Sequence, residues 1–304
     1  MKRGVLAFSG GLLALAAVCP TGCSTVAEYG AMAGQAAGVL TSDQAASINR
    51  TAVAVEKTAQ DITPEQEYYI GRSVAATVLG AYKPWDSAAV NQYLNVVGQT
   101  LALSSERPET YGGYHFLAVD SDEVNAFAAP GGLIFVSRGL LRCCRSEDVV
   151  AAVLAHEIGH VQGQHGLRAI KKGRLTAALT TVALEAGKNL AGQQLAEVAK
   201  AFEGSVSDIT STLMNSGYAR ALENEADGAA VQILARAGYN PHALVDLLSE
   251  MKPRLAEDAR GFGKTHPSPE VRIQHVSGLL DGLAAPAAPG ARQQRFAAAL
   301  TRVL

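Results

Sequence analysis

The sequence is poor in cysteine and in aromatic residues, and neither sign of charge dominates it. Four cysteines and one tryptophan occur among 304 residues, aromatic residues make up 6%, and the formal net charge is −2. Cys143 and Cys144 are the only cysteines beyond the N-terminal region, so no disulfide framework is indicated. The near-neutral charge gives no electrostatic case for nucleic-acid binding, and no aromatic platform of the glycan-binding kind is present.

Long hydrophobic runs are also missing. The apolar stretch from Val5 to Val18 and the uncharged stretch from Leu175 to Leu184 are both too short to cross a bilayer as a helix. Hydrophobic residues nevertheless make up 48% of the chain, which is enough to bury a substantial core. We therefore expect a globular domain without membrane-spanning helices.

The first 23 residues have the pattern of a bacterial signal peptide. Lys2 and Arg3 precede the apolar stretch, and small residues lead to Cys23. The sequence Thr21-Gly22-Cys23 resembles the end of a lipobox, where a signal peptidase cleaves before a lipidated cysteine. We expect lipidation of Cys23 and, because Ser24 follows it, a periplasmic protein anchored to the outer membrane. Plain secretion is the alternative.

The sequence HEIGH places two histidines on one face of a helix. His156 and His160 can then reach one zinc ion, and Glu157 can act on a water beside it. The apolar run Val149–Leu154 favours a helix here, and Ser146 is placed to cap its start. We interpret the stretch as a zinc site rather than as two surface histidines.

A catalytic zinc site needs a third protein ligand, and the sequence offers two sources. His165 lies one residue short of the spacing in HExxHxxGxxH proteases, so we expect it beside the site or at the surface. Glu223 and Asp227 lie four residues apart in a stretch with helical periodicity. One carboxylate can bind zinc while the other accepts a hydrogen bond from a ligand imidazole. A solvated acidic helix face is the alternative.

Turn signals and hydrophobic periodicity divide the remaining chain. We expect helices over 63–80, 87–103 and, in two pieces, 241–283, with strands over 114–119 and 132–136. The expected domains are an Ala-rich tether or helix at 24–62, a domain at 63–283, and a linker with a terminal helix at 284–304. The domain carries an insertion at 171–217, for which we consider a lid, a membrane-facing hairpin or simple packing.

Four motifs in this order resemble the HtpX and CAAX-prenyl-protease type of zinc metallopeptidase. They are the stretch from Asn125 to Leu141, HEIGH with its preceding apolar run, the ExxAD segment at Glu223, and Thr265-His266-Pro267 followed by Arg272. The last of these is similar to a segment of the soluble periplasmic, BepA-like branch. The resemblance implies an α+β, mainly α-helical, zincin-like metallopeptidase domain with a small β-sheet beside the HExxH helix.

The resemblance also implies the roles of individual residues. His156, His160 and Glu223 would bind one Zn2+ per chain. Glu157 would be the catalytic acid/base, and Asp227 would support a ligand imidazole.

Two residues are candidates for holding the oxyanion. Arg220 is one, with an ion pair to Glu223 or Asp227 as its alternative role. His266 is the other, and as a reversible fourth zinc ligand it would instead keep the enzyme latent. A loop-stabilising role is the ordinary interpretation of this histidine.

The strand ahead of the zinc helix is a candidate substrate-binding element. An extended substrate would pair with its backbone by β-augmentation. The residues concerned are Gly132, Leu133, Ile134 and Phe135. An ordinary core strand is the alternative.

These features together predict a zinc-dependent endopeptidase of the bacterial cell envelope, acting in protein quality control or outer-membrane protein assembly. The expected substrates are unfolded or misassembled envelope proteins. Two other functions stay open: a chaperone or scaffold with secondary proteolysis, and a zinc amidase acting on a non-peptide bond.

Overall fold

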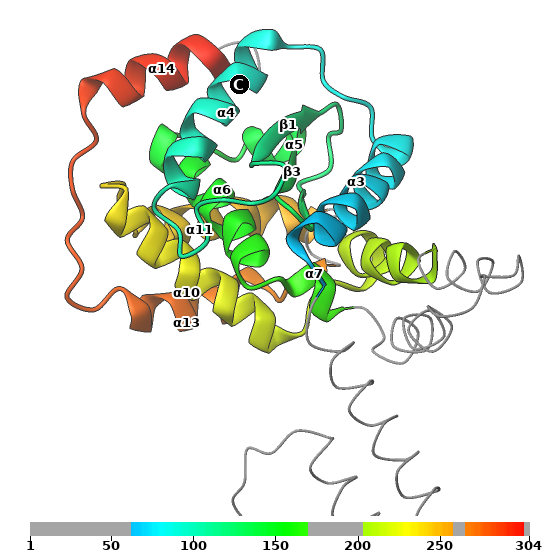
Figure 1. Ribbon diagram of the computed structural model, residues 1–304. Coiled ribbons are helices and arrows are strands. Elements are labelled where there is room, and N and C mark those ends of the chain that lie inside the picture. The colour runs from blue at the N-terminus through cyan, green and yellow to red at the C-terminus, as the bar shows by residue number, and fades with distance from the viewer. Residues whose placement is uncertain (1–61, 170–202, 258–264, 301–304) are drawn as a thin grey trace, which may run out of the picture. The chain divides into compact units, whose positions relative to one another are not determined.

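The computed structural model describes residues 62–169, 203–257 and 265–300 (Figure 1). The expected signal peptide, the lipidated Cys23, the tether up to residue 61 and residues 171–202 of the insertion lie outside this part of the chain. Among the described helices, none combines the length and the hydropathy that a bilayer span requires.

Helices form most of the described structure, and three short strands form one sheet. The helices are α3 (Pro64–Ala81), α4 (Ala88–Ala102), α5 (Arg138–Leu141), α6 (Glu147–Gln162), α7 (His165–Arg168), the π-helix η1 (Thr212–Ser216), α10 (Arg220–Arg236), α11 (Ala243–Glu257), α13 (Pro269–Leu279) and α14 (Gly290–Leu300). The strands are β1 (His115–Val119), β2 (Ala126–Ala129) and β3 (Leu133–Ser137).

Side-chain caps fix the starts of two helices where the sequence predicts them. Thr63 and Gln66 form a reciprocal capping box at α3, with Pro64 in the first turn. The hydroxyl of Ser146 accepts a hydrogen bond from Val149 N and caps α6. These local bonds set the first turn of the helix that carries HEIGH.

The sheet has the order β1-β3-β2, so β3 is its central strand. β1 pairs with β3 in parallel, and β2 pairs with β3 in antiparallel fashion over its whole length. The prediction that Gly132 to Phe135 pair with a substrate is therefore wrong, because both edges of β3 are already occupied. β2, whose sequence AFAA lacks β-branched residues, escaped prediction.

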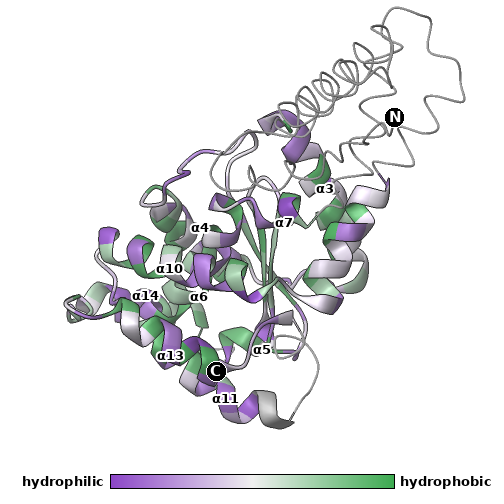
Figure 2. Ribbon diagram, turned by 90° about the horizontal axis from the view of Figure 1, so that it is seen from below, coloured by the Kyte–Doolittle hydropathy of each residue, from purple (hydrophilic) through white to green (hydrophobic). Residues whose placement is uncertain are grey.

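The two faces of the sheet belong to two hydrophobic clusters. Ile134 and Val136 lie in a large cluster with residues of α4, α6, α10 and α11, whereas Phe135 lies in a smaller cluster with α3. Figure 2 shows α3 on one side of the strands, with α4, α6 and α10 on the other. Successive side chains of β3 point to opposite faces of the sheet, and each face packs against its own layer of helices.

Helix α6 is buried from Glu147 to Val161. It packs against α10 and against the face of the sheet that carries Ile134 and Val136. A Cβ atom at Gly159 would lie 2.8 Å from the carbonyl oxygen of Ala226 in α10. Only a glycine therefore permits the two helices to approach this closely.

Helix α14 lies beside α4 (Figure 1), and two of its arginines form ion pairs with the start of α6. Arg295 Nη2 lies 2.5 Å from Glu147 Oε1, and Arg292 Nη1 lies 3.2 Å from Asp148 Oδ1. The ring of Phe296 is buried against the main cluster. Both carboxylates also lie at the positive end of the α6 dipole, which favours them there.

Candidate metal centre

Four side chains from three separate segments converge at the middle of α6. One ligand atom from each of His156, His160, Glu223 and His266 lies within 4.8 Å of every other. His156 and His160 come from α6, Glu223 comes from the first turn of α10, and His266 comes from the loop before α13. The first three side chains are almost completely buried.

The spacing of the donor atoms of His156, His160 and Glu223 is close to that around a four-coordinate metal ion. Donors bound at ~2.0–2.1 Å to a tetrahedral ion lie about 3.3 Å from each other. His156 Nε2 and His160 Nε2 are 3.1 Å apart, and the Glu223 oxygens lie 3.5 and 3.7 Å from these nitrogens. Glu223 Oε1 is buried and accepts no hydrogen bond from any described residue. A bound cation would satisfy that oxygen.

Burial keeps both histidines of α6 in the form that binds metals. It lowers the pKa of His156 and of His160, so their imidazoles are neutral at pH 7. The Nδ1 atom of His156 lies 2.9 Å from Asp227 Oδ1. This contact fixes the proton on Nδ1 and leaves Nε2 facing the group.

Arg272 holds Asp227 in place, and its Nη2 atom also lies 3.1 Å from His156 Nδ1. Its Nε and Nη2 atoms donate to the two carboxylate oxygens at 3.0 and 2.5 Å, and both side chains are almost fully buried. Burial alone would raise the pKa of Asp227, but the charge of Arg272 and the contact with His156 hold it well below its usual range. In the sequence, Arg272 stands out only because it follows Thr265-His266-Pro267. Nothing in the sequence indicates its contact with Asp227, which lies 45 positions away.

Glu157 lies beside the group without belonging to it. It is buried and lines a small cavity with His160, His266 and the middle of β2. Burial, reinforced by the negative charge of Glu223, raises the pKa of Glu157 to about 8.

Tyr218 covers the cavity and was not a sequence candidate. Its ring stacks on His160 with 4.5 Å between centroids and 21° between planes. It follows Gly217, whose φ is +70° and where a Cβ atom would lie 1.8 Å from the carbonyl oxygen of Thr265. The close approach at this glycine seats the loop that carries His266 against the start of α10.

Arg220 and His165, both candidates from the sequence, do not belong to the four converging side chains. Arg220 is exposed at the start of α10 and makes no ion pair with Glu223 or Asp227 among those described. His165, in contrast, is fully buried, and its Nδ1 lies 2.9 Å from His160 Nδ1.

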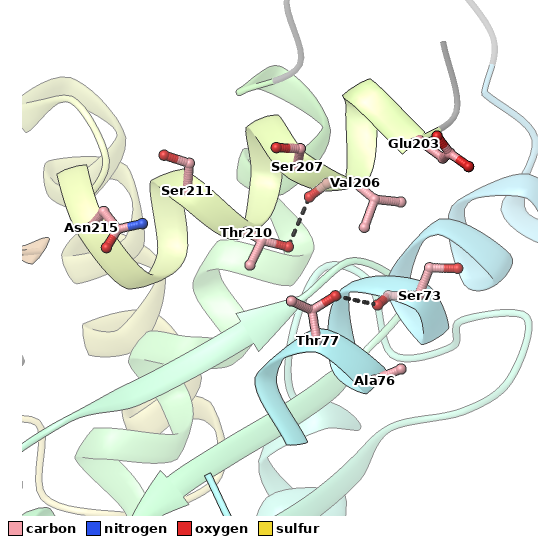
Figure 3. A pocket seen from close by; sticks show the side chains of 9 residues that line it. All are labelled: Ser73, Ala76, Thr77, Glu203, Val206, Ser207, Thr210, Ser211 and Asn215. Atoms are coloured by element: carbon pink, nitrogen blue, oxygen red, sulfur yellow. Dashed lines mark hydrogen bonds between the residues drawn. The ribbon is translucent and has the colours of Figure 1, made fainter. Parts of the chain in front are cut away.

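A second cavity, of about 760 Å³, lies apart from this group between α3 and residues 203–216 (Figure 3). Small polar side chains line it, among them Ser73, Thr77, Ser207 and Thr210. The hydroxyl of Thr77 donates to Ser73 O in α3, and that of Thr210 donates to Val206 O in the helical residues 203–211 that precede η1. Glu203 is the one carboxylate among the described residues that line this cavity, and no histidine or cysteine accompanies it.

Two histidines one helical turn apart, a carboxylate from a neighbouring helix and a buried glutamate between them define a metallopeptidase of the HExxH class. The chain belongs to peptidase family M48, whose pattern its residues 88–280 match.

The names of similar proteins are those of proteases, which is consistent with this family. The chain is 30% identical to the beta-barrel assembly-enhancing protease of Yersinia pestis over 68% of its own length, and 29% identical to that of Escherichia coli over the same share. It is 32% identical to the mitochondrial metalloendopeptidase OMA1 of Schizosaccharomyces pombe over 50% of its length. The chain spans only 41% or 42% of the length of these relatives.

The raised pKa of Glu157 predicts a stability cost that the variant Glu157→Gln removes. The folded, metal-free protein retains this proton between about pH 4.5 and about pH 8, where the unfolded chain has released it. Only the unfolded chain releases this proton in that range, so the free energy of unfolding falls progressively as the pH rises through it. We expect Glu157→Gln to be more stable than the native protein at pH 8, and the difference to vanish near pH 4.

Denaturant unfolding of both metal-free proteins at pH 4.5, 6 and 8 measures this difference. A stability difference that is the same at all three pH values would contradict the burial of an ionisable Glu157.

Proposed function

We propose that the protein is a zinc-dependent endopeptidase in which His156, His160 and Glu223 hold the metal. The observation that carries the proposal is the buried set of two imidazoles and one carboxylate at tetrahedral spacing, with the orphaned oxygen of Glu223. Two nitrogen donors and one oxygen donor in this geometry suit zinc.

The residues of the chain divide the reaction between them. Bound zinc would supply a Lewis acid that polarises the scissile carbonyl. Glu157 accepts a proton from the attacking water and returns it to the leaving amine. Asp227 and Arg272 keep His156 in its ligating tautomer.

Strand β2 is the element on which we place the substrate. Ser137 N donates to Asn125 O at 3.0 Å, so these two residues form a hydrogen-bonded pair. Such pairs alternate along an antiparallel ladder, and the backbone N–H and C=O groups of the odd-numbered residues of β2 therefore point toward β3. Ala126 and Ala128 consequently direct their backbone groups to the opposite edge, and Ala126 N already donates to Asn125 Oδ1. Both residues line the cavity that contains Glu157 and His160. A substrate strand paired with Ala128 would therefore pass the metal centre.

Pairing at the edge of β2 predicts an alternating pattern in the substrate. We expect N-methylation of a cleaved peptide, one position at a time, to lower kcat/KM at every second residue. The reason is that alternate substrate N–H groups point toward the strand. Uniform effects along the peptide, or effects confined to the scissile bond, would exclude strand pairing.

We place the enzyme in the cell envelope, attached by a lipid on Cys23. The signal-like N-terminus supports this placement, and so do relatives named for β-barrel assembly. Unfolded or misassembled envelope proteins are the proposed substrates. An unfolded chain supplies the extended segment that the edge of β2 can bind.

The direct test of the proposed function is digestion of an unfolded protein such as reduced casein. We expect cleavage that chelation abolishes and zinc restores, and a loss of about 10³-fold or more in Glu157→Gln, since this residue moves the proton. Glu109→Gln, which changes an exposed residue, is the matched control. If the native protein failed to cleave the substrate with zinc present, but both it and Glu157→Gln prevented aggregation of the substrate, a chaperone function would replace the peptidase.

His266 is proposed to hold the enzyme latent. Its Nδ1 lies 2.6 Å from Glu223 Oε2 within the four-residue group. Four protein ligands would close a site that catalysis requires open. The cavity beside it, bounded by β2, Tyr218 and the Thr265–His266 loop, measures only about 10 Å³. That space holds about one water molecule, so a peptide enters only after the covering elements move.

The variant His266→Ala separates latency from oxyanion binding. If His266 blocks the site, the variant retains one zinc ion per chain and cleaves peptides several-fold faster than the native protein. If His266 holds the oxyanion, the variant is instead slowed about 10²-fold. A rate and a zinc content both equal to those of the native protein would remove His266 from either role.

A further inference from the structure

His165 is the feature of the site that the proposed mechanism leaves unused. Its side chain is completely buried, yet it lies outside the group of potential metal ligands. One ring nitrogen, Nδ1, lies 2.9 Å from His160 Nδ1. The other, Nε2, lies 3.1 Å from Glu225 Oε2, and Arg168 contacts the same carboxylate at 2.5 Å.

The positions of the protons follow from the geometry. His160 directs Nε2 toward His156 Nε2 and Glu223, so its proton resides on Nδ1. That proton is donated to Nδ1 of His165, which must accept there. His165 consequently carries its own proton on Nε2 and donates it to Glu225. The chain of donors thus runs from His160 outward to a carboxylate that is 50% exposed.

The two histidines of α6 are therefore supported differently. His156 donates directly to Asp227, a buried carboxylate. The Nδ1 atom of His160 instead reaches a carboxylate, that of Glu225, through a second imidazole.

We propose that His165 and Glu225 are positioning residues that hold His160 in its metal-binding tautomer and orientation. This inference rests on the proposed metal site. At His160 the imidazole of His165 and the carboxylate of Glu225 form a relay, whereas at His156 one buried carboxylate does the same work alone.

The local backbone is shaped to bring His165 back to the site. Helix α6 ends at Gln162, and Gln164 adopts the left-handed conformation with φ of 51°. The chain therefore reverses instead of carrying His165 away along a continued helix. A Cβ atom at Gly163 would lie 2.3 Å from His165 Nε2, so this position admits only glycine while the imidazole keeps its place.

Metal binding measured without catalysis tests the relay. Zinc affinity is determined by competition with a chelator, and the visible spectrum of the cobalt-substituted protein reports the geometry of the ligands. All variants carry Glu157→Gln, so the readout does not depend on peptidase activity.

His165→Leu leaves the Nδ1–H of His160 without an acceptor, and we expect zinc affinity to fall 10- to 100-fold. His165→Gln can both accept and donate, so it should recover much of that loss. Glu225→Gln should weaken binding several-fold and shift the cobalt spectrum. It changes a half-exposed residue, so it tests the relay even if His165→Leu fails to fold. Glu250→Gln, at a surface ion pair with Arg145, is the control.

Native affinity and a native cobalt spectrum in Glu225→Gln and in His165→Gln, together with native affinity in any folded His165→Leu, would overturn the relay. Equal losses in His165→Gln and His165→Leu, with Glu225→Gln unaffected, would overturn it also, because packing alone would then explain the effect. If the native protein, with Glu157 in place, bound zinc but cleaved no peptide, the proposed function would fail, and the measured zinc affinities alone would decide whether the relay exists.

Discussion

The close contact between α6 and α10 is the constraint on which the site depends. At Gly159 the helices approach until no side chain fits between its Cα and the backbone of Ala226. This distance allows Glu223 to face the two histidines of α6, and it brings Asp227 within 2.9 Å of His156. A larger residue at the crossing would separate the carboxylates from the imidazoles by the width of a side chain.

The same contact buries charges that water would otherwise stabilise, and the neighbouring segments compensate for this cost. Arg272 from α13 neutralises Asp227, and His266 contacts Glu223. Burial raises the pKa of Glu157, which forms no ion pair with any of the described residues. The centre is thus assembled from α6, α10 and α13 at once, which explains why the catalytic domain needs the helices that follow HEIGH.

The sequence predicted the parts of this centre that follow a local period. Spacings of four residues placed His156 with His160 and Glu223 with Asp227, and the caps at Thr63 and Ser146 gave the helix starts. The predictions that failed concerned contacts between residues far apart in the sequence. β3 was expected to bind substrate because a single strand does not reveal its neighbours, and the Ala-rich β2 lacks the β-branched residues that mark strands. The return of His165 depends on one left-handed residue, Gln164, which no periodicity signals.

We propose that His156, His160, Glu223 and His266 together surround one metal ion in the resting protein. An X-ray absorption spectrum at the zinc edge of the purified protein is the direct test. We expect a four-coordinate ion with nitrogen and oxygen ligands only, three of them imidazoles in the native protein and two in His266→Ala. Sulfur in the coordination shell, or an unchanged number of imidazoles in the variant, would contradict it.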